Sequence, residues 1–305
     1  MALNRHILMD SLPVNLASRL FWKTKLFRNS QDSLPYEKLF SSIELKWPQI
    51  KGEGFYEVPA QAPQGEFDPA FQVARWRGDH YPTVIYHHGN NERPFNHWPL
   101  VRNTFHDIFL AGSEPFPANL IVVRAPFHCS FRSYLKHMGH LSTFSTLMAV
   151  SVKVIENLRN YAVKKSSGVT VSGISLGGWI TNLHRAYFNS ADIYLPLLAG
   201  TAPADVFTHS VYRKLTDRKA RNNPEALEKA LDFKQAFAAR QNNNVFPLLA
   251  RYDQLIRYDK QKASYGDIPV AVIERGHVTG SMAALELRRH IRDHLVLIPA
   301  KSINK

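Results

Sequence analysis

The sequence predicts an α/β fold, in which a mostly parallel, twisted sheet is covered by helices on both faces. Short apolar, strand-like runs alternate with helical segments through most of the chain, as in folds built on parallel sheets. The chain has 305 residues and is 45% hydrophobic, which is enough to build one large α/β core. Around Ser175 a strand-like run, a glycine-rich turn and a helical pattern follow one another directly.

The N-terminal region is expected to be a helical extension over residues 1–50, followed by the α/β domain at 51–305. Leu8, Leu12, Leu16 and Leu20 recur at helical spacing, and Pro13 is expected to interrupt this helix. A basic amphipathic segment with aromatic residues can lie on a membrane surface. Packing of the helix on its own domain is the alternative.

The elements of the α/β domain follow in order. The first strand-like segments, 54–58 and 71–76, have no helix between them and are expected to form an antiparallel edge. The elements expected next are a strand at 83–88, a helix at 98–110, a strand at 119–124, a helical region at 134–164, a strand at 168–172, a helix at 178–188 and a strand at 192–198. A helical, charged stretch at 204–241, strands at 245–250 and 269–273, and a helix at 281–295 complete the domain.

The segment at about 201–244 is longer than a simple crossover needs, so it is expected to be a small helical cap insertion. Caps over active sites exclude water and shape the substrate pocket. An enlarged crossover with no lid role is the alternative.

The composition limits the possible compartments and cofactors. Cys129 is the one cysteine, so neither an intramolecular disulfide nor a Cys-based zinc site can form, which favours a reducing compartment. No apolar run approaches the roughly 18 residues of a spanning helix, and Arg19 and Lys23 follow too closely for a secretory signal. We expect a cytoplasmic protein with no cofactor and no metal site.

The formal net charge of +13 comes from Lys and Arg spread through the chain, not from basic blocks. No helix-turn-helix, RNP-type or Cys/His finger pattern is present, so a nucleic-acid partner is not expected. A diffuse positive field can attract anionic substrates or favour peripheral membrane contact. Solvated surface charge with no specific partner is the simpler explanation.

The motif Gly173-Ile174-Ser175-Leu176-Gly177 reads G-x-S-x-G between a predicted strand and a predicted helix. This is the context of a nucleophile elbow, in which a strained turn exposes the serine Oγ at the end of a central strand. The small neighbours make room for that turn, and the backbone N–H of Leu176 points toward a reacting carbonyl oxygen. A glycine-rich turn without a catalytic role is the alternative.

A serine nucleophile needs a histidine base and an acid that orients it. His277 follows the last predicted strand in a Gly-His loop, whereas His290 and His294 lie on the final helix as packing or surface residues. Asp253 follows the penultimate strand and is the preferred acid. Asp205, Asp259 and Asp267 are its competitors.

An oxyanion hole is expected where the strand at 83–88 runs into Gly89-Asn90-Asn91. The backbone N–H of Asn90 is the candidate for the second donor, beside that of Leu176. His88 is expected to brace this loop. A metal role for His87 and His88 is not expected, because adjacent strand residues point to opposite faces.

With these residues in place, the chain resembles the α/β-hydrolase superfamily over about residues 54–298. The resemblance implies that Ser175 is the nucleophile, His277 the general base and then acid, and Asp253 the orienting acid. It also implies that Leu176 and Asn90 donate oxyanion N–H groups. The stretch 195–207 is similar to a little-described branch named "α/β-hydrolase domain-containing". His-Gly-Asn-Asn stands where many lipases and esterases have His-Gly-Gly-Gly.

The sequence therefore predicts a serine hydrolase that cleaves a carboxylic ester or thioester through an acyl-enzyme. Its substrate is expected to be a small-molecule or lipid ester. A lipid acyl hydrolase at a membrane surface and a non-catalytic binding protein on the same fold are the alternatives. The sequence does not specify the acyl or alcohol group, nor the oligomeric state.

Overall fold

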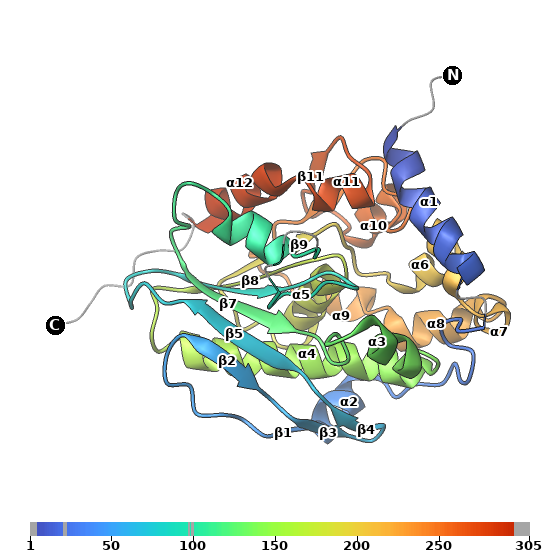
Figure 1. Ribbon diagram of the computed structural model, residues 1–305, viewed down its shortest axis with the longest axis horizontal. Coiled ribbons are helices and arrows are strands. Elements are labelled where there is room, and N and C mark those ends of the chain that lie inside the picture. The colour runs from blue at the N-terminus through green and yellow to red at the C-terminus, as the bar shows by residue number, and fades with distance from the viewer. Residues whose placement is uncertain (1–4, 21–22, 97, 99–100, 296–305) are drawn as a thin grey trace.

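A computed structural model describes residues 5–20, 23–96, 98 and 101–295 (Figure 1). Its main sheet has eight strands in the order β11-β10-β9-β8-β6-β7-β5-β2. The bounds of these strands are β2 Gly54–Glu57, β5 Ala70–Arg75, β6 Thr83–His87, β7 Asn119–Arg124, β8 Val169–Ile174, β9 Ile193–Leu197, β10 Leu248–Ala250 and β11 Ala271–Ile273.

The pairing in this sheet is parallel from β11 through to β7. The strands β5 and β2 pair antiparallel at the end of the sheet. The predicted antiparallel edge is therefore confirmed. Because the other strands run in one direction, their carboxyl ends meet at one edge, where ligands bind in open α/β sheets.

Both faces of the sheet are buried, and the two faces belong to different hydrophobic cores. In β7, Ile121 and Val123 pack into one core, whereas Leu120 and Val122 pack into the other. The helices α4 (Leu141–Ala162) and α5 (Leu176–Tyr187) cover the first face. The helix α12 (Ala284–Leu295) and the π-helix η1 (His106–Leu110) cover the second (Figure 1). The predicted fold class is confirmed.

A second, three-stranded sheet in the order β1-β3-β4 was not predicted from the sequence. It consists of β1 Glu44–Leu45, β3 Ala60–Ala62 and β4 Gly65–Phe67. Its strands are too short to show a period-2 pattern. The helix α2 (Tyr36–Ser42) precedes this sheet and packs on α4.

The helix predicted at 98–110 is wrong over its first part, since the described residues before Thr104 are not helical. The side chain of Asn103 explains where the helix begins. Its Oδ1 accepts the backbone N–H of His106, as a helix-capping residue does. Its Nδ2 donates to the carbonyls of Pro94 and Asn96 and holds the preceding loop.

The helical region predicted at 134–164 is two helices, α3 (Phe131–His137) and α4. Between them, the carbonyls of Met138 and Gly139 accept the backbone N–H groups of Phe27 and Asn29. Ser30 in turn accepts the N–H of Leu141. A distant segment therefore takes the hydrogen bonds that would have continued the helix.

The stretch predicted as helical at 204–241 is a series of short helices. They are α6 Ala204–Thr208, η2 Val211–Leu215, α7 Arg218–Arg221, α8 Pro224–Leu231 and α9 Lys234–Ala238. The side chains of Ser210, Asp217 and Asn223 each cap the helix that follows. These caps divide the segment into separate short helices. The helices α6 and η2 face the pocket described below, whereas α9 packs back on α5.

The N-terminal helix α1 (Arg5–Leu20) differs from expectation in two ways. It continues through Pro13, although proline removes one helical hydrogen bond, and it packs on η2 and on α11 (His277–Ser281). Its buried residues are His6, Asp10 and Val14, while the leucines of the predicted apolar stripe are exposed. Across the described residues, no helix is both long and apolar enough to traverse a bilayer.

Candidate active site

The carboxyl ends of four parallel strands bring the predicted site residues together. Ser175 follows β8, Asp253 follows β10 and His277 follows β11, while Gly89 and Asn90 follow β6. These residues are far apart in the sequence. They meet because parallel strands end at the same edge of the sheet.

Ser175 has φ 56° and ψ −113°, a strained conformation for a residue with a side chain. It lies directly between β8 and α5. A Cβ at Gly173 would overlap the backbone of Gly177, and a Cβ at Gly177 would overlap the carbonyl of His87. The turn therefore requires glycine at both positions of the motif.

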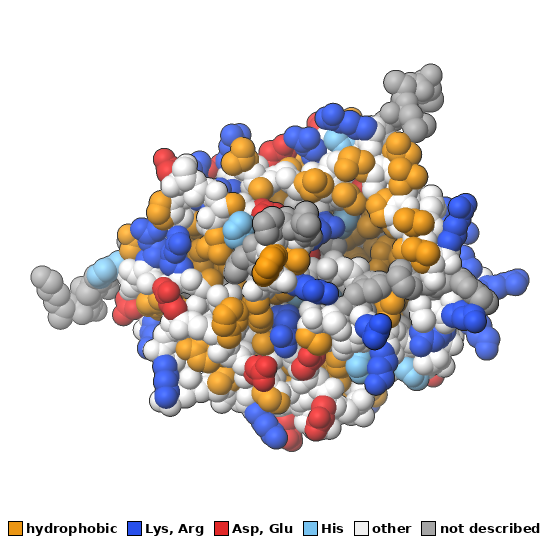
Figure 2. Space-filling view, in the orientation of Figure 1, with side chains coloured by type: hydrophobic (Ala, Val, Ile, Leu, Met, Phe, Trp, Pro, Cys, Tyr) orange, Lys and Arg blue, Asp and Glu red, His pale blue; other side chains and the backbone are white. Residues whose placement is uncertain are grey.

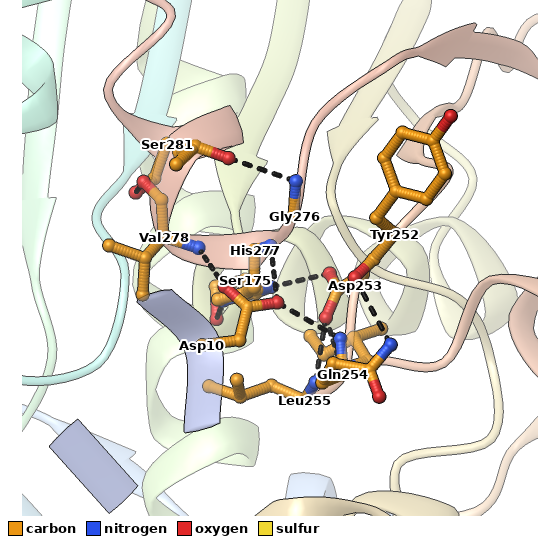
Figure 3. Close-up of polar contacts among 12 residues, drawn as sticks. Asp10, Ser175, Tyr252, Asp253, Gln254, Leu255, Gly276, His277, Val278 and Ser281 are labelled. Carbon is orange, nitrogen blue, oxygen red and sulfur yellow. Dashed lines mark hydrogen bonds and ion pairs between the residues drawn. The ribbon is translucent and has the colours of Figure 1, made fainter. Parts of the chain in front are cut away.

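The imidazole of His277 bridges Ser175 and Asp253 (Figure 3). Its Nδ1 lies 2.7 Å from Asp253 Oδ2, and its Nε2 lies 3.0 Å from Ser175 Oγ. Because a carboxylate only accepts, Nδ1–H donates to Asp253 and Nε2 is left to accept from the serine hydroxyl. This tautomer can remove the serine proton.

Asp253 is the acid that the fold places beside His277. Its second oxygen, Oδ1, accepts the backbone N–H groups of Leu255 at 2.8 Å and Ile256 at 2.7 Å. Of the competing acids, Asp205 is ion-paired with Arg257, and Asp259 and Asp267 are exposed.

The charges around His277 favour its protonated form. Burial lowers the pKa of His277, but the carboxylate of Asp253, its hydrogen bond and the charge of Asp10 together raise that pKa above its usual value. Burial also raises the pKa of Asp253, while the imidazolium of His277 opposes this effect. The pair is therefore suited to hold a proton on the histidine.

Of the two predicted oxyanion donors, Asn90 precedes Ser175 in the sequence and Leu176 follows it directly. Both line the same pocket. Leu176 is the first residue of α5, where backbone N–H groups have no carbonyl partner within the helix. Asn90 is held by its side chain, which contacts Tyr212 Oη at 3.2 Å and His128 Nε2 at 3.0 Å.

His88 braces the loop that carries Asn90. Its Nδ1 donates to the carbonyl of Gly89 at 2.6 Å, and its Nε2 accepts the N–H of Ala125 at 3.0 Å. Burial and the neighbouring His87 hold the pKa of His88 well below its usual value. Among the described residues, no three His, Cys, Asp or Glu side chains are grouped so as to hold a metal ion.

A pocket of about 240 Å³ opens at Ser175 and His277. Its walls come from α1, the loop after β6, α3, α4, α5 and the segment after β9. Most of the lining side chains are apolar, among them Val14, Leu26, Leu135, Phe144, Trp179, Phe207 and Leu215. Small-molecule sites have this combination of an apolar wall and a few converging polar groups.

Asp10 on α1 is a site residue that the sequence analysis did not identify. Its carboxylate accepts the backbone N–H groups of Gln254, His277 and Val278 (Figure 3). The available signal was that Asp10 is the one acidic residue in the first thirty-one, which are otherwise neutral or basic. Arg102 and Tyr212, which also line the pocket, were missed because no motif marks them.

No protein-family model and no curated protein sequence matches this chain. Its fold is similar to that of solved peptidase and esterase structures. An acylaminoacyl peptidase from Pyrococcus horikoshii matches with a TM-score of 0.55 and 12% identity, over 84% of this chain and 43% of the peptidase. This chain therefore spans less than half of that protein.

Acetyl xylan esterase 1 from Thermoanaerobacterium sp. JW/SL YS485 matches with a TM-score of 0.53 and 16% identity, over 84% of this chain and 92% of the esterase. A cold-adapted esterase from an Arctic intertidal metagenomic library matches with a TM-score of 0.50 and 12% identity, over 83% of this chain and 97% of the esterase. The chain has the α/β-hydrolase fold.

Proposed function

We propose that this protein is a serine hydrolase that cleaves a carboxylic ester or thioester. The observation that carries the proposal is the continuous hydrogen-bonded series from Ser175 through His277 to Asp253, set on a strained turn inside an apolar pocket. A binding module on the same fold has no need of all three groups. The esterases of similar fold support the same class of reaction.

In this reaction Ser175 Oγ attacks the substrate carbonyl carbon while its proton passes to His277 Nε2. The negative charge on the carbonyl oxygen is stabilised by the backbone N–H groups of Leu176 and Asn90. The bond to the leaving alcohol or thiol breaks, and the leaving group takes the proton from His277. Water then attacks the acyl-enzyme by the same route and releases the acid.

The test is covalent labelling with a fluorophosphonate probe, followed by hydrolysis of p-nitrophenyl esters of increasing acyl length. We expect one label on Ser175, none on the Ser175→Ala variant, and turnover that depends on acyl length. Ser41, an exposed serine on α2, provides a matched Ser41→Ala control that should label normally. Labelling that survives Ser175→Ala would contradict Ser175 as the nucleophile. A folded wild type with no label and no turnover would favour the non-catalytic binding protein.

A further inference from the structure

The helix α1 has two faces with different environments. One face carries His6, Asp10 and Val14 into the protein. The opposite face, which we call the outer face, consists of Leu8, Leu12, Leu16 and Leu20. These leucines have exposed fractions of 40%, 55%, 60% and 66%, respectively. Spaced four residues apart, they form one line along the helix.

Single exposed leucines are common, but an aligned row on one helix is not explained by the fold. Figure 2 shows hydrophobic side chains gathered over α1, with Lys and Arg side chains at the neighbouring margin of the molecule. The row lies on the helix that also forms one wall of the pocket, since Pro13, Val14 and Ala17 line it together with Ser175.

The surroundings of the outer face are basic. The one acidic residue within 5–28 is Asp10, and it is buried. Beside α1, the segment 211–221 adds exposed cations, and Lys214 Nζ donates to Asn15 Oδ1 of α1 at 2.6 Å. We call this set of exposed cations the basic rim: Arg19, Arg213, Lys214, Arg218 and Lys219.

The charge of the rim decides between possible occupants. A second copy of the chain in a two-fold dimer would place the rim against itself, and like charges across an interface are unfavourable. An anionic lipid surface satisfies both features, because the leucines enter the interface while the cations contact the headgroups.

We propose that the outer face of α1 and the basic rim dock this protein on an anionic lipid surface. Docking places the mouth of the pocket next to the lipid, so that an acyl ester can reach Ser175 from that surface. The access of substrate rests on the proposed function, whereas the docking itself does not.

The experiment is co-sedimentation of the full chain with vesicles of phosphatidylcholine and phosphatidylglycerol, compared with vesicles of phosphatidylcholine alone. We expect binding to the mixed vesicles and little to the neutral ones. Leu16→Glu should weaken partitioning by about tenfold or more, because it removes a leucine that the lipid would bury and adds a charge that the anionic surface repels. Lys219→Glu should weaken it by about fivefold or more, and salt should reduce that difference.

Phe55→Glu is the matched control, since Phe55 is 61% exposed on β2 at the far edge of the sheet. It should bind vesicles like the wild type. Circular dichroism checks that each variant is folded. The proposal is overturned if the wild type does not bind mixed vesicles, binds both kinds equally, or binds equally after Leu16→Glu. A wild-type dimer that Leu16→Glu dissociates without lipid would assign the face to self-association.

Vesicle binding does not depend on Ser175, so Ser175→Ala should bind like the wild type. A wild type that binds the mixed vesicles but hydrolyses no ester would therefore contradict the proposed function alone. Hydrolysis with no vesicle binding would contradict the docking alone.

A separate observation concerns the buried face of α1. Asp10 is fully buried, and its Oδ2 accepts the N–H groups of His277 at 2.9 Å and Gln254 at 3.0 Å. Its Oδ1 accepts the N–H of Val278 at 2.8 Å. One carboxylate thus holds both the loop of the acid and the loop of the base.

We also infer that Asp10 is a positioning residue for His277. The charged groups that face His277 are Asp253 after β10, Asp10 on α1 and Arg102 before η1, with Glu92 3.9 Å from Arg102. Asp10 holds the imidazole in place through backbone N–H groups. Its charge also acts on the imidazolium, in the same direction as that of Asp253 and against that of Arg102.

The test measures the imidazole titration of His277 by NMR, which needs no substrate, together with kcat. In Asp10→Asn the pKa of His277 should fall, and misplacement of the ring should lower kcat by up to about 100-fold. Thr279→Val is the matched control, because it removes the His6–Thr279 contact between α1 and this loop, and the acceptor of the Gly276 N–H, without changing charge. It should leave the titration of His277 unchanged.

If Asp10→Asn does not fold, Asp10→Ser is measured instead. An unchanged titration of His277 in the neutral variant would overturn the inference. So would an equal shift in Thr279→Val, because the effect would then be a loosened loop.

Discussion

Two loops at the same edge of the sheet contain a histidine next to a glycine, and the two histidines have opposite properties. After β6, His88 precedes Gly89, and its pKa is held well below the usual value by burial and by His87. After β11, His277 follows Gly276, and adjacent carboxylates raise its pKa against the effect of burial. Both histidines lie next to a glycine at the same edge of the sheet. The difference between their pKa values therefore comes from the groups that each ring contacts.

The partners of His88 are backbone groups, the Gly89 carbonyl and the Ala125 N–H, and both ring nitrogens are occupied by them. The partners of His277 are a carboxylate and a hydroxyl. A ring between Asp253 and Ser175 can gain a proton at Nε2 and keep its position. A ring between two fixed backbone groups braces a loop.

The largest effect should come from His277→Ala. We expect kcat/KM to fall by about 10⁴-fold or more, because removing the base from such a triad removes most of its chemistry. The measurement is hydrolysis of a p-nitrophenyl ester, with circular dichroism to check the fold. A folded variant with near-normal turnover would remove the distinction between the two histidines.

Asp253→Asn should have the next largest effect, a fall of about 10⁴-fold in kcat, because the amide favours the wrong tautomer and no longer stabilises the imidazolium. Asp205→Asn is the comparison, since Asp205 pairs with Arg257 and with the exposed His209, neither of which contacts Ser175. It should leave kcat within about tenfold of the wild type and act on stability instead. If Asp205→Asn costs more activity than Asp253→Asn, the acid has been assigned to the wrong loop.

The placement of Ser175, Asp253 and His277 could be predicted from the sequence because each follows a buried strand in a parallel sheet. Strand ends determine which loops meet, and the hydrophobic pattern shows the strand ends. The bounds of β7, Asn119–Arg124, agree with the predicted strand for the same reason.

The role of Asp10 could not be predicted, because it depends on contacts between α1 and loops more than 240 residues away. The face of α1 that packs on the protein could not be predicted for a related reason. Leucine periodicity indicates an apolar face, but it does not say whether that face meets the protein or another surface. The helix breaks at Met138 and Gly139 likewise depend on a distant segment.

Stability in acid should also separate the two kinds of histidine. Burial lowers the pKa of both His87 and His128 to about 3. Below about pH 6.5 the unfolded chain protonates these rings and the folded chain does not, so the stability present above that pH is lost as pH falls toward 3. His277 acts in the opposite direction, since its raised pKa contributes stability at low pH that is lost as pH rises through it.

We expect the free energy of unfolding in urea to fall by about 2 kcal/mol for each such buried ring between pH 7.5 and pH 5. His87→Phe should reduce this difference by about that amount. Because the free energy of unfolding of one variant is compared between two pH values, any packing cost of the substitution that does not depend on pH cancels. Equal stability of the wild type at both values would contradict the neutral, buried state of these rings.

The smallest effect on activity should come from His88→Gln, which tests the brace directly. The variant leaves the buried N–H of Ala125 without its imidazole acceptor, so the free energy of unfolding at neutral pH should fall by about 1–3 kcal/mol. The pH profile of kcat/KM should keep its position, rising with pH through a midpoint above about 6.5, because His277 must lose its proton to act as a base and its pKa is raised. His80→Gln is the matched control, since His80 is exposed in a turn, and it should change neither quantity. A profile that moves in His88→Gln but not in His80→Gln would mean that the brace, and not His277 alone, titrates in the activity.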